Sequence, residues 1–204
     1  MHPNILSEAQ KELLPVLGSM QREFYLVGGT AIALQIGHRQ SIDFDMFKKG
    51  TVRKEKISQT LRNHHLQWQV LFSDAEGFHI LVNGVKLTFF QFPFDMPAKT
   101  KFGDMRMPDL LHLAAMKAYA LGRRAKWKDY VDLFFLLRDH FNLEILMDKT
   151  ITLFPDLFSP KLFKQQLCYF QDIDYSEEVT FMPGFEVSND DVKLFLTEIA
   201  SRSI

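Results

Sequence analysis

The spacing of apolar residues changes near residue 100 of this chain, from short strand-like runs to a helical period. Before that point, short apolar runs are separated by turn-forming residues, and the run at 42–47 alternates acidic and apolar residues with the period of a half-buried strand. Asn83-Gly84, between two such runs, is a strong hairpin signal. The expected strands cover residues 24–27, 42–47, 66–72, 78–82 and 85–92.

Helical spacing appears between some of these strands. Leu6, Leu13 and Leu17 recur on one side of a helix that Ser7 is suited to begin. Gly37 is suited to end a second helix, because glycine readily adopts the left-handed conformation at a helix C-terminus. The expected helices here cover residues 6–21, 30–36 and 53–64.

After Gly103 the helical spacing continues to the C-terminus, and Pro108 is suited to the first turn of the next helix. The sequence therefore predicts an α+β protein, in which a mixed sheet flanked by helices occupies residues 1–103 and a helical domain occupies residues 104–204. The expected helices of the second domain cover residues 110–121, 127–140, 143–153, 161–170 and 190–201.

Composition narrows the class of protein. The formal net charge of -1 provides no overall positive field to draw the chain onto nucleic acid, so any such contact requires a local patch. Cys168 is the only cysteine, which excludes an internal disulfide and a cysteine zinc cluster, and we interpret it as a small buried apolar residue. The N-terminus has no signal-peptide pattern and no apolar run approaches 18 residues, so we expect a cytoplasmic protein without a membrane segment.

A first candidate for chemistry is the turn Gly28-Gly29-Thr30 at the end of the first expected strand. Paired glycines let the backbone approach a ligand closely, and the N-terminus of the following helix favours a phosphate. Thr30 adds a hydroxyl at the same place. A purely structural turn is the alternative for this motif taken alone.

Asp43 and Asp45 form the second candidate, a D-x-D motif on a strand. Residues i and i+2 of a strand face the same side, so the two carboxylates project together while Phe44 faces the core. Their mutual repulsion would be compensated by Mg²⁺ or Mn²⁺, held by the two carboxylates together with triphosphate oxygens. The alternative is a solvated pair on a strand edge.

Arg39 and Ser41 lie between these two motifs and are further candidates for nucleotide binding. The guanidinium of Arg39 is suited either to the charge of a triphosphate or to a nearby carboxylate.

The segment LVGGTAIALQIGHRQSIDFDMF resembles the opening motif of the polymerase-β-type nucleotidyltransferases, in which a Gly-Gly or Gly-Ser turn precedes a strand bearing D-x-D. Its form, with GHRQSIDFD, is similar to the AbiEii/AbiGii branch of toxins from abortive-infection and toxin–antitoxin systems. The later segment LLHLAAMKAYALGRRAKWKDYVDLFFLL resembles the second half of that branch.

This resemblance implies roles for individual positions. The glycine turn with Thr30 would hold phosphate, and the D-x-D pair would hold the metal. From the second segment it assigns Lys117 to the triphosphate and Asp129 or Asp132 to the last motif, with the helical domain completing the cleft. The surrounding sequence also indicates that Lys117 requires an anionic partner, because this lysine interrupts an otherwise apolar helix. Pairing of Asp129 or Asp132 with a nearby lysine is an equally simple interpretation of either carboxylate.

One position departs from the pattern of the superfamily. Many of its enzymes carry a third carboxylate on a later strand, as the base that activates the acceptor hydroxyl, and this chain has Thr88 there. A threonine hydroxyl cannot accept a proton near neutral pH. The base would then be Asp43, Asp45 or another group such as Asp129, or the enzyme would be slow.

A weaker signal is the segment Gly122–Asp129, which gathers four cations around Trp127. An indole among cations can stack on a base and hold the phosphates of an RNA. The alternative is the solvated start of a helix.

The expected reaction is the metal-dependent transfer of a nucleoside monophosphate from an NTP to an acceptor hydroxyl. The resemblance implies RNA, including tRNA ends, as the acceptor and an antitoxin protein as a partner. One alternative is an aminoglycoside-type nucleotidyltransferase with a narrow, acidic acceptor pocket, rather than a basic rim around Arg123, Arg124 and Lys126. The other is a non-catalytic nucleotide-binding module of the same fold, which Thr88 favours and the D-x-D pair opposes.

Overall fold

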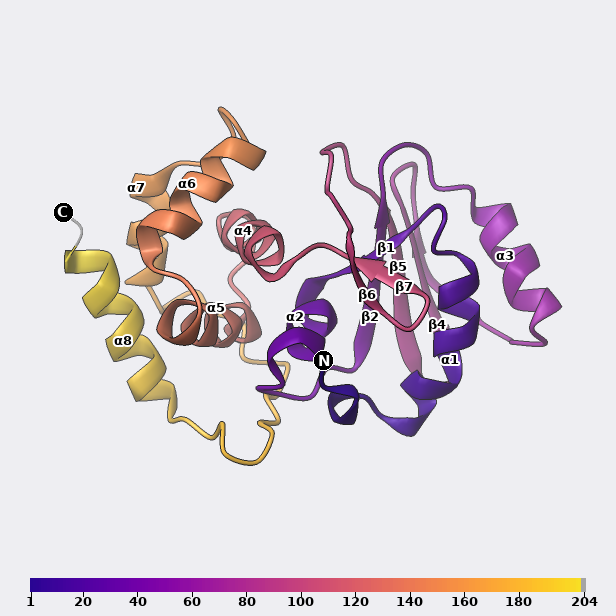
Figure 1. The fold of residues 1–204 in the computed structure, drawn as a ribbon, viewed down its shortest axis with the longest axis horizontal. Helices are drawn as coiled ribbons and strands as arrows, with labels where there is room; N and C mark the ends of the chain where they lie inside the picture. Colours follow the sequence, from indigo (N-terminus) through magenta and orange to yellow (C-terminus); the bar gives the residue numbers. More distant parts are fainter. Residues whose placement is uncertain (203–204) are drawn as a thin grey trace. The chain divides into compact units, whose positions relative to one another are not determined.

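The computed structural model describes residues 1–202, and the final two residues of the predicted helical domain lie outside the described part. The chain forms two compact units, the first comprising Met1–Asp109 and the second beginning at Leu110. The first unit contains the strands and the second contains only helices and loops within the described range (Figure 1).

A five-stranded mixed sheet forms the centre of the first unit. Its strand order is β1-β2-β5-β4-β3. Strand β2 runs antiparallel to β1 and parallel to β5, and the β5-β4-β3 part is antiparallel. The strands are β1 (Tyr25–Val27), β2 (Asp43–Lys48), β3 (Gln69–Ser73), β4 (Gly77–Val82) and β5 (Val85–Gln91).

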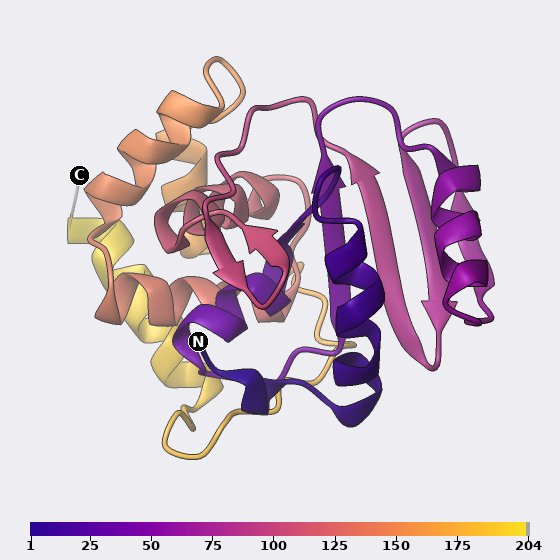
Figure 2. The same cartoon turned by 45° about the vertical axis from the view of Figure 1, so that its right-hand side comes forward.

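Three α-helices accompany this sheet, and Figure 2 shows α1 and α3 lying along it. Helix α1 (Glu8–Ser19) begins with a capping box, in which the Ser7 side chain accepts from the backbone of Gln10 and the Gln10 side chain accepts from the backbone of Ser7. Helix α2 (Gly28–Ile36) follows β1 directly and ends at Gly37, whose φ of 77° confirms the predicted left-handed C-terminal residue. Helix α3 covers Lys54–Asn63, close to the prediction, and a 3₁₀ turn, η1 (Pro3–Ile5), precedes α1.

The alternation predicted for residues 42–47 is present in β2. Phe44 and Met46 are 0% and 1% exposed, whereas Asp43 and Asp45 are half-buried on the opposite face. Leu87 and Phe89 of β5 are fully buried as well. Burial of each such side chain contributes roughly 1.5–3 kcal/mol, which holds the strand in one register and so fixes the direction of both carboxylates.

The turn Asn83-Gly84 joins β4 to β5 with φ angles of 49° and 77°, which confirms the predicted two-residue hairpin. The strand predicted for 66–72 begins later, at Gln69. A second hairpin, β6 (Thr100–Phe102) and β7 (Met105–Met107), was not predicted, because its three-residue strands are too short for a periodic signal.

The domain boundary expected at residues 103 and 104 falls inside this small hairpin. The observed boundary between the two compact units lies later in the chain, between Asp109 and Leu110. Pro108 lies two residues before helix α4 rather than in its first turn. Its carbonyl oxygen accepts a hydrogen bond from the Gln35 side chain at 3.0 Å, so it belongs to the packing of the first unit.

The second unit is built from five helices in its described part. Helices α4 and α6 have the predicted bounds, and α5 and α8 differ from theirs by at most one residue at either end. Helix α7 begins one residue earlier and ends three residues sooner than expected. Cys168 follows α7 and is exposed, so its interpretation as a buried residue was wrong. The helices are α4 (Leu110–Leu121), α5 (Trp127–Asp139), α6 (Leu143–Leu153), α7 (Pro160–Leu167) and α8 (Asn189–Arg202).

Helix α5 lies at the centre of this unit, with ten consecutive or nearly consecutive buried positions between Trp127 and Leu137. The loop between α7 and α8 packs aromatic rings against it, for example Phe181 and Phe185 against Phe135. Among residues 1–202, no helix is long and apolar enough to cross a bilayer.

Candidate nucleotide and metal site

The D-x-D pair lies on a central strand of the sheet. In β2, Asp45 is opposite Val27 of β1 on one side and Thr88 of β5 on the other, and Asp43 is opposite Lys86. The two carboxylates therefore share one face of the sheet, as the sequence predicted, and both remain half-buried. The alternative of a pair on a strand edge does not apply, because β2 has a neighbour on each side.

The glycine turn touches this pair. Gly28 has a φ of 72°, and a Cβ atom placed on it would lie 2.2 Å from Oδ2 of Asp45. A side chain at this position would therefore be strained by its backbone conformation and would collide with the carboxylate. Gly28 begins helix α2, so the Asp45 carboxylate lies at the positive end of that helix.

Thr30 faces inward from the turn. Its hydroxyl lies 2.7 Å from the Ser41 hydroxyl and donates to the backbone carbonyl of Asp43. Both Thr30 and Ser41 are buried, at 2% and 7% exposure. These contacts tie the first turn of α2 to the start of β2, so the two hydroxyls hold the turn and the D-x-D strand in one position.

Arg39 lies behind the same turn. Its side chain is buried, at 2% exposure, and Nη1 donates to the Gln40 carbonyl at 2.9 Å. A Cβ atom on Gly29 would lie 2.4 Å from Nη2 of Arg39, so Gly29 must lack a side chain for the guanidinium to fit. The guanidinium thus brings positive charge against the helix start, next to the place where the sequence predicts phosphate.

Thr88 lies where the superfamily's third carboxylate was expected. It is opposite Asp45 in the β2–β5 pairing, it is buried at 8% exposure, and its hydroxyl is 3.3 Å from Nδ1 of His79 on β4. His79 and Lys86 occupy the same sheet face and were not among the predicted site residues. Lys86 was detectable as the i−2 neighbour of Thr88, but the position of His79 depends on strand pairing.

The donor set fits a hard divalent cation. Mg²⁺ and Mn²⁺ take oxygen ligands, and a nucleotide-dependent Mg²⁺ site typically uses one or two carboxylates plus phosphate oxygens. Asp43 and Asp45 present two such carboxylates beside a helix start that a Cβ atom at Gly28 would obstruct. Within the described chain, no three His, Cys, Asp or Glu side chains form a metal-holding cluster.

In the second unit, Lys117 has the anionic partners that the sequence required. Its Nζ lies 2.7 Å from Oδ1 of Asp129 and 2.9 Å from Oδ2 of Asp132, and all three side chains are at most 4% exposed. Arg124, half-exposed, adds a contact of 3.0 Å from Nε to Oδ2 of Asp129. Of the two interpretations of Lys117, the buried ion pair is therefore present in the structure.

The cationic segment predicted around Trp127 is engaged within the second unit. The indole is 4% exposed, so it cannot stack on a base without rearrangement. Lys126 pairs with Glu177, and Lys128 contacts the same carboxylate at 2.7 Å. Burial on its own would raise the pKa of Glu177, but hydrogen bonds from the two lysines lower it to about 2.

Arg123 is one of two exposed cations of that segment, with Arg124. Its guanidinium stacks 3.7 Å from the centre of the Tyr119 ring, which in turn stacks on Phe154 at 4.0 Å. Beside it lies a surface hollow of about 620 Å³, whose walls include Tyr169 and Gln165 of the α7 region.

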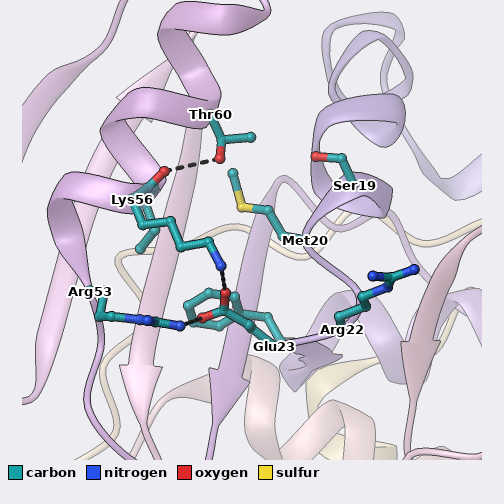
Figure 3. A pocket seen from close by; sticks show the side chains of 9 residues that line it. Ser19, Met20, Arg22, Glu23, Arg53, Lys56 and Thr60 are labelled. Carbon is teal, nitrogen blue, oxygen red and sulfur yellow. Dashed lines mark hydrogen bonds and ion pairs between the residues drawn. The ribbon is translucent and has the colours of Figure 1, made fainter.

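A smaller hollow, of about 120 Å³, lies in the first unit between α1 and α3 (Figure 3). Figure 3 shows Lys56 and Arg53 pointing toward Glu23, and Lys48 contacts the same carboxylate at 3.2 Å. The Lys56 hydrogen bond, together with Lys48 and Arg53, lowers the pKa of Glu23 to about 2 against the opposing effect of burial. This cluster joins the α1–β1 loop to α3 and has none of the candidate site residues in its walls.

Solved structures share this architecture over nearly its whole length. A structure of JHP933 from Helicobacter pylori has a TM-score of 0.60 and 17% identity, with 97% of this chain and 92% of that protein covered. MenT4, a nucleotidyltransferase toxin from Mycobacterium tuberculosis H37Rv, has a TM-score of 0.67 and 13% identity, with coverage of 95% and 80%. At such identities the likeness concerns the fold, and it confirms the predicted α+β nucleotidyltransferase fold.

No family model matches the chain. A sequence relative, the uncharacterized protein aq_aa25 of Aquifex aeolicus (strain VF5), is 32% identical over 143 residues, which amount to 66% of this chain and 68% of that protein. The chain belongs to the same family as aq_aa25, and its fold is that of the nucleotidyltransferase toxins.

Proposed function

We propose that this protein transfers a nucleoside monophosphate from an NTP to an acceptor hydroxyl with the help of Mg²⁺ or Mn²⁺. The observation that carries the proposal is the contact between two elements. The helix start that suits phosphate lies against Asp45, and Asp43 shares the same sheet face.

The candidate site residues of the first unit have separate roles in this proposal. Gly28, Gly29 and the start of α2 bind the phosphates, while buried Thr30 and Ser41 hold that turn against β2. Arg39 contributes positive charge next to the turn. Asp43 and Asp45 would hold the cation, which when bound neutralises charge that develops on the phosphate oxygens.

The part played by the second unit is also a proposal. The resemblance assigns Lys117 to the triphosphate and Asp129 or Asp132 to the last motif. Because Lys117 is held by two carboxylates in this structure, its assignment predicts that a nucleotide competes with them for the ammonium group.

RNA is the acceptor class that the surface of the second unit favours. Arg123 and Arg124 are exposed, and the hollow beside Arg123 offers a guanidinium plane and the Tyr169 ring on which a base could stack. The exposed cations beside it correspond to the basic rim expected for an RNA-directed enzyme rather than to the acidic pocket of an aminoglycoside-type enzyme. A toxin role, with an antitoxin as partner and a cytoplasmic location, is proposed on the resemblance and on the fold shared with MenT4.

A non-catalytic nucleotide-binding module is the competing function, and Thr88 is the observation that favours it. A buried threonine replaces the expected base opposite Asp45. Such a module would bind Mg-NTP and transfer nothing.

The decisive experiment incubates the protein with each labelled NTP and Mg²⁺ or Mn²⁺, with either total RNA or a set of aminoglycosides as acceptor, and follows label incorporation into each acceptor. Binding of each Mg-NTP is measured in parallel by equilibrium dialysis. We expect both binding and metal-dependent incorporation. Binding without incorporation into RNA or any aminoglycoside would establish the non-catalytic module, and incorporation into an aminoglycoside alone would establish the small-molecule enzyme.

A further inference from the structure

His79 lies on the sheet face that carries the D-x-D pair. Asp45 on β2 is opposite Thr88 on β5, and Thr88 is opposite His79 on β4. Residues directly opposite each other in adjacent strands project to the same side of a sheet. Asp45, Thr88 and His79 therefore form a row across three adjacent strands, with the imidazole one strand beyond the missing carboxylate.

The imidazole of His79 is held in this position. Nδ1 lies 3.3 Å from the Thr88 hydroxyl, and the ring packs against Phe72 with 5.6 Å between ring centres. Nε2 is directed to the space above Gly77, where a Cβ atom would lie only 2.9 Å away. Thr88 is buried and His79 is half-buried, so the threonine orients a ring that solvent can still reach.

We propose that His79, oriented by Thr88, accepts the proton of the acceptor hydroxyl during nucleotidyl transfer. This inference rests on the proposed function and names the group that takes over from the superfamily's third carboxylate. Thr88 is a positioning residue, because it acts through the ring of His79 rather than on a substrate.

The proposed transfer exchanges one phosphorus–oxygen bond for another. The acceptor oxygen forms a bond to the α-phosphorus, and the bond from that phosphorus to the oxygen bridging the α- and β-phosphates breaks with its electron pair. Pyrophosphate leaves, and the hydroxyl proton moves to Nε2 of His79. For Nε2 to accept it, Nδ1 must carry the other ring proton and donate it to the Thr88 hydroxyl oxygen.

The charges around the ring agree with this role. Burial and the positive charge of Lys86 on β5 lower the pKa of His79, while Asp45 on β2 and Asp74 before β4 act in the opposite direction. The net effect of these groups is to lower the pKa of His79. Its imidazole is therefore neutral and able to accept a proton near pH 7.

The test uses His79→Gln, which keeps a hydrogen-bonding side chain but cannot accept a proton. We expect the transfer rate to fall by roughly 10²–10⁴-fold, as for loss of a general base, with Mg-NTP affinity and melting temperature close to wild type. The limb of the wild-type pH–rate profile that rises with pH should disappear in the variant. His64→Gln, at an exposed position after α3, is the matched control and should behave as wild type.

A second variant restores the carboxylate that the chain lacks. Thr88→Asp in the His79→Gln background should regain at least about tenfold in rate, because an aspartate opposite Asp45 would replace the histidine as base. His79→Gln at the wild-type rate, an unchanged pH profile, or a double variant as slow as the single one would each overturn the role of His79. Wild-type protein that binds Mg-NTP but never transfers would instead refute the proposed function itself.

Discussion

Each unit of this protein contains a pair of neighbouring aspartates, and the two pairs differ in burial and in surroundings. On the sheet, Asp43 and Asp45 stay half-buried beside a helix start and a glycine turn. In the helical unit, Asp129 and Asp132 are almost completely buried and share the ammonium group of Lys117. Burial of charged groups is tolerated in the second unit only because opposite charges lie within 3 Å.

This difference indicates what each pair can do. The half-buried carboxylates on the sheet face are the ones proposed to hold a cation, next to the helix start proposed to bind phosphate. Buried oxygens paired with Lys117 primarily stabilise the helical unit, and any ligand must compete with that pairing. Substitution of each group should therefore separate binding from stability.

The largest effect is expected from Asp43→Asn combined with Asp45→Asn. If the two carboxylates hold the metal as proposed, their loss should remove several kcal/mol of transition-state stabilisation, so transfer should fall by roughly a thousandfold or more, and metal-dependent NTP binding should be lost. The free energy of unfolding should change little, because the repulsion between the carboxylates disappears together with the favourable interaction between Asp45 and the start of α2. Asp95→Asn, at an exposed position of the same unit, is the control, and Mg-NTP binding at wild-type affinity would refute the metal assignment.

The next effect concerns Lys117→Met and is mainly one of stability. Removal of the ammonium leaves two buried carboxylates without it, so the free energy of unfolding should fall by about 3–5 kcal/mol. Urea unfolding measures this loss, and Lys161→Met, at an exposed position, should show almost none. Mg-NTP affinity of the still-folded variant then tests the triphosphate role, which unchanged affinity would exclude.

A smaller effect distinguishes the glycine turn from an ordinary turn. Gly28→Ala should cost about 1 kcal/mol for its positive φ and a further ~1–3 kcal/mol for the collision with Asp45. Gly50→Ala isolates the first term, because Gly50 also has a positive φ, of 85°, but nothing within 4 Å of its added Cβ atom. Equal losses of stability and unchanged Mg-NTP affinity in the two variants would contradict the contact between turn and carboxylate.

The smallest effect concerns Glu23, a carboxylate surrounded by cations near the surface. Its pKa is lowered from 4.5 to about 2 in the folded protein, so its contribution is complete above pH 4.5 and is lost as the pH falls toward 2. Lys56 and Arg53 are 59% and 63% exposed, so screening should keep the contribution below about 1 kcal/mol. Unfolding of Glu23→Gln and wild type at pH 7, 4 and 2.5 (roughly spanning this window) should show a difference in stability that shrinks with acid, and a difference that does not change with pH would contradict the lowered pKa of Glu23.

Much of the site could be predicted because its signals are local. The alternation around Asp43 and Asp45 fixes a strand with both carboxylates on one face, and burial of Phe44 and Met46 enforces it. The glycine turn followed by a helix is likewise contained in ten consecutive residues. The helix ends at Ser7 and Gly37 were predicted for the same reason, because helix capping involves only residues close in sequence.

Predictions that depended on residues distant in sequence were less successful. Neither alternative for Trp127, a stacking residue or part of a solvated helix start, describes its buried indole, because Tyr175 and the loop around Asp174 pack against the start of α5. Cys168 proved exposed because α7 ends before it, a boundary that the apolar pattern did not mark.

The sequence by itself determined the α+β class, the D-x-D strand and the phosphate-suited turn, since each follows from side-chain periods of two or 3.6 residues and from the conformational freedom of glycine. Only the tertiary structure decided that Gly28 touches Asp45, that Lys117 is buried between Asp129 and Asp132, and that His79 shares the face of Thr88. Those relations arise from strand register and helix packing, which are set by the simultaneous burial of apolar surfaces far apart in the chain.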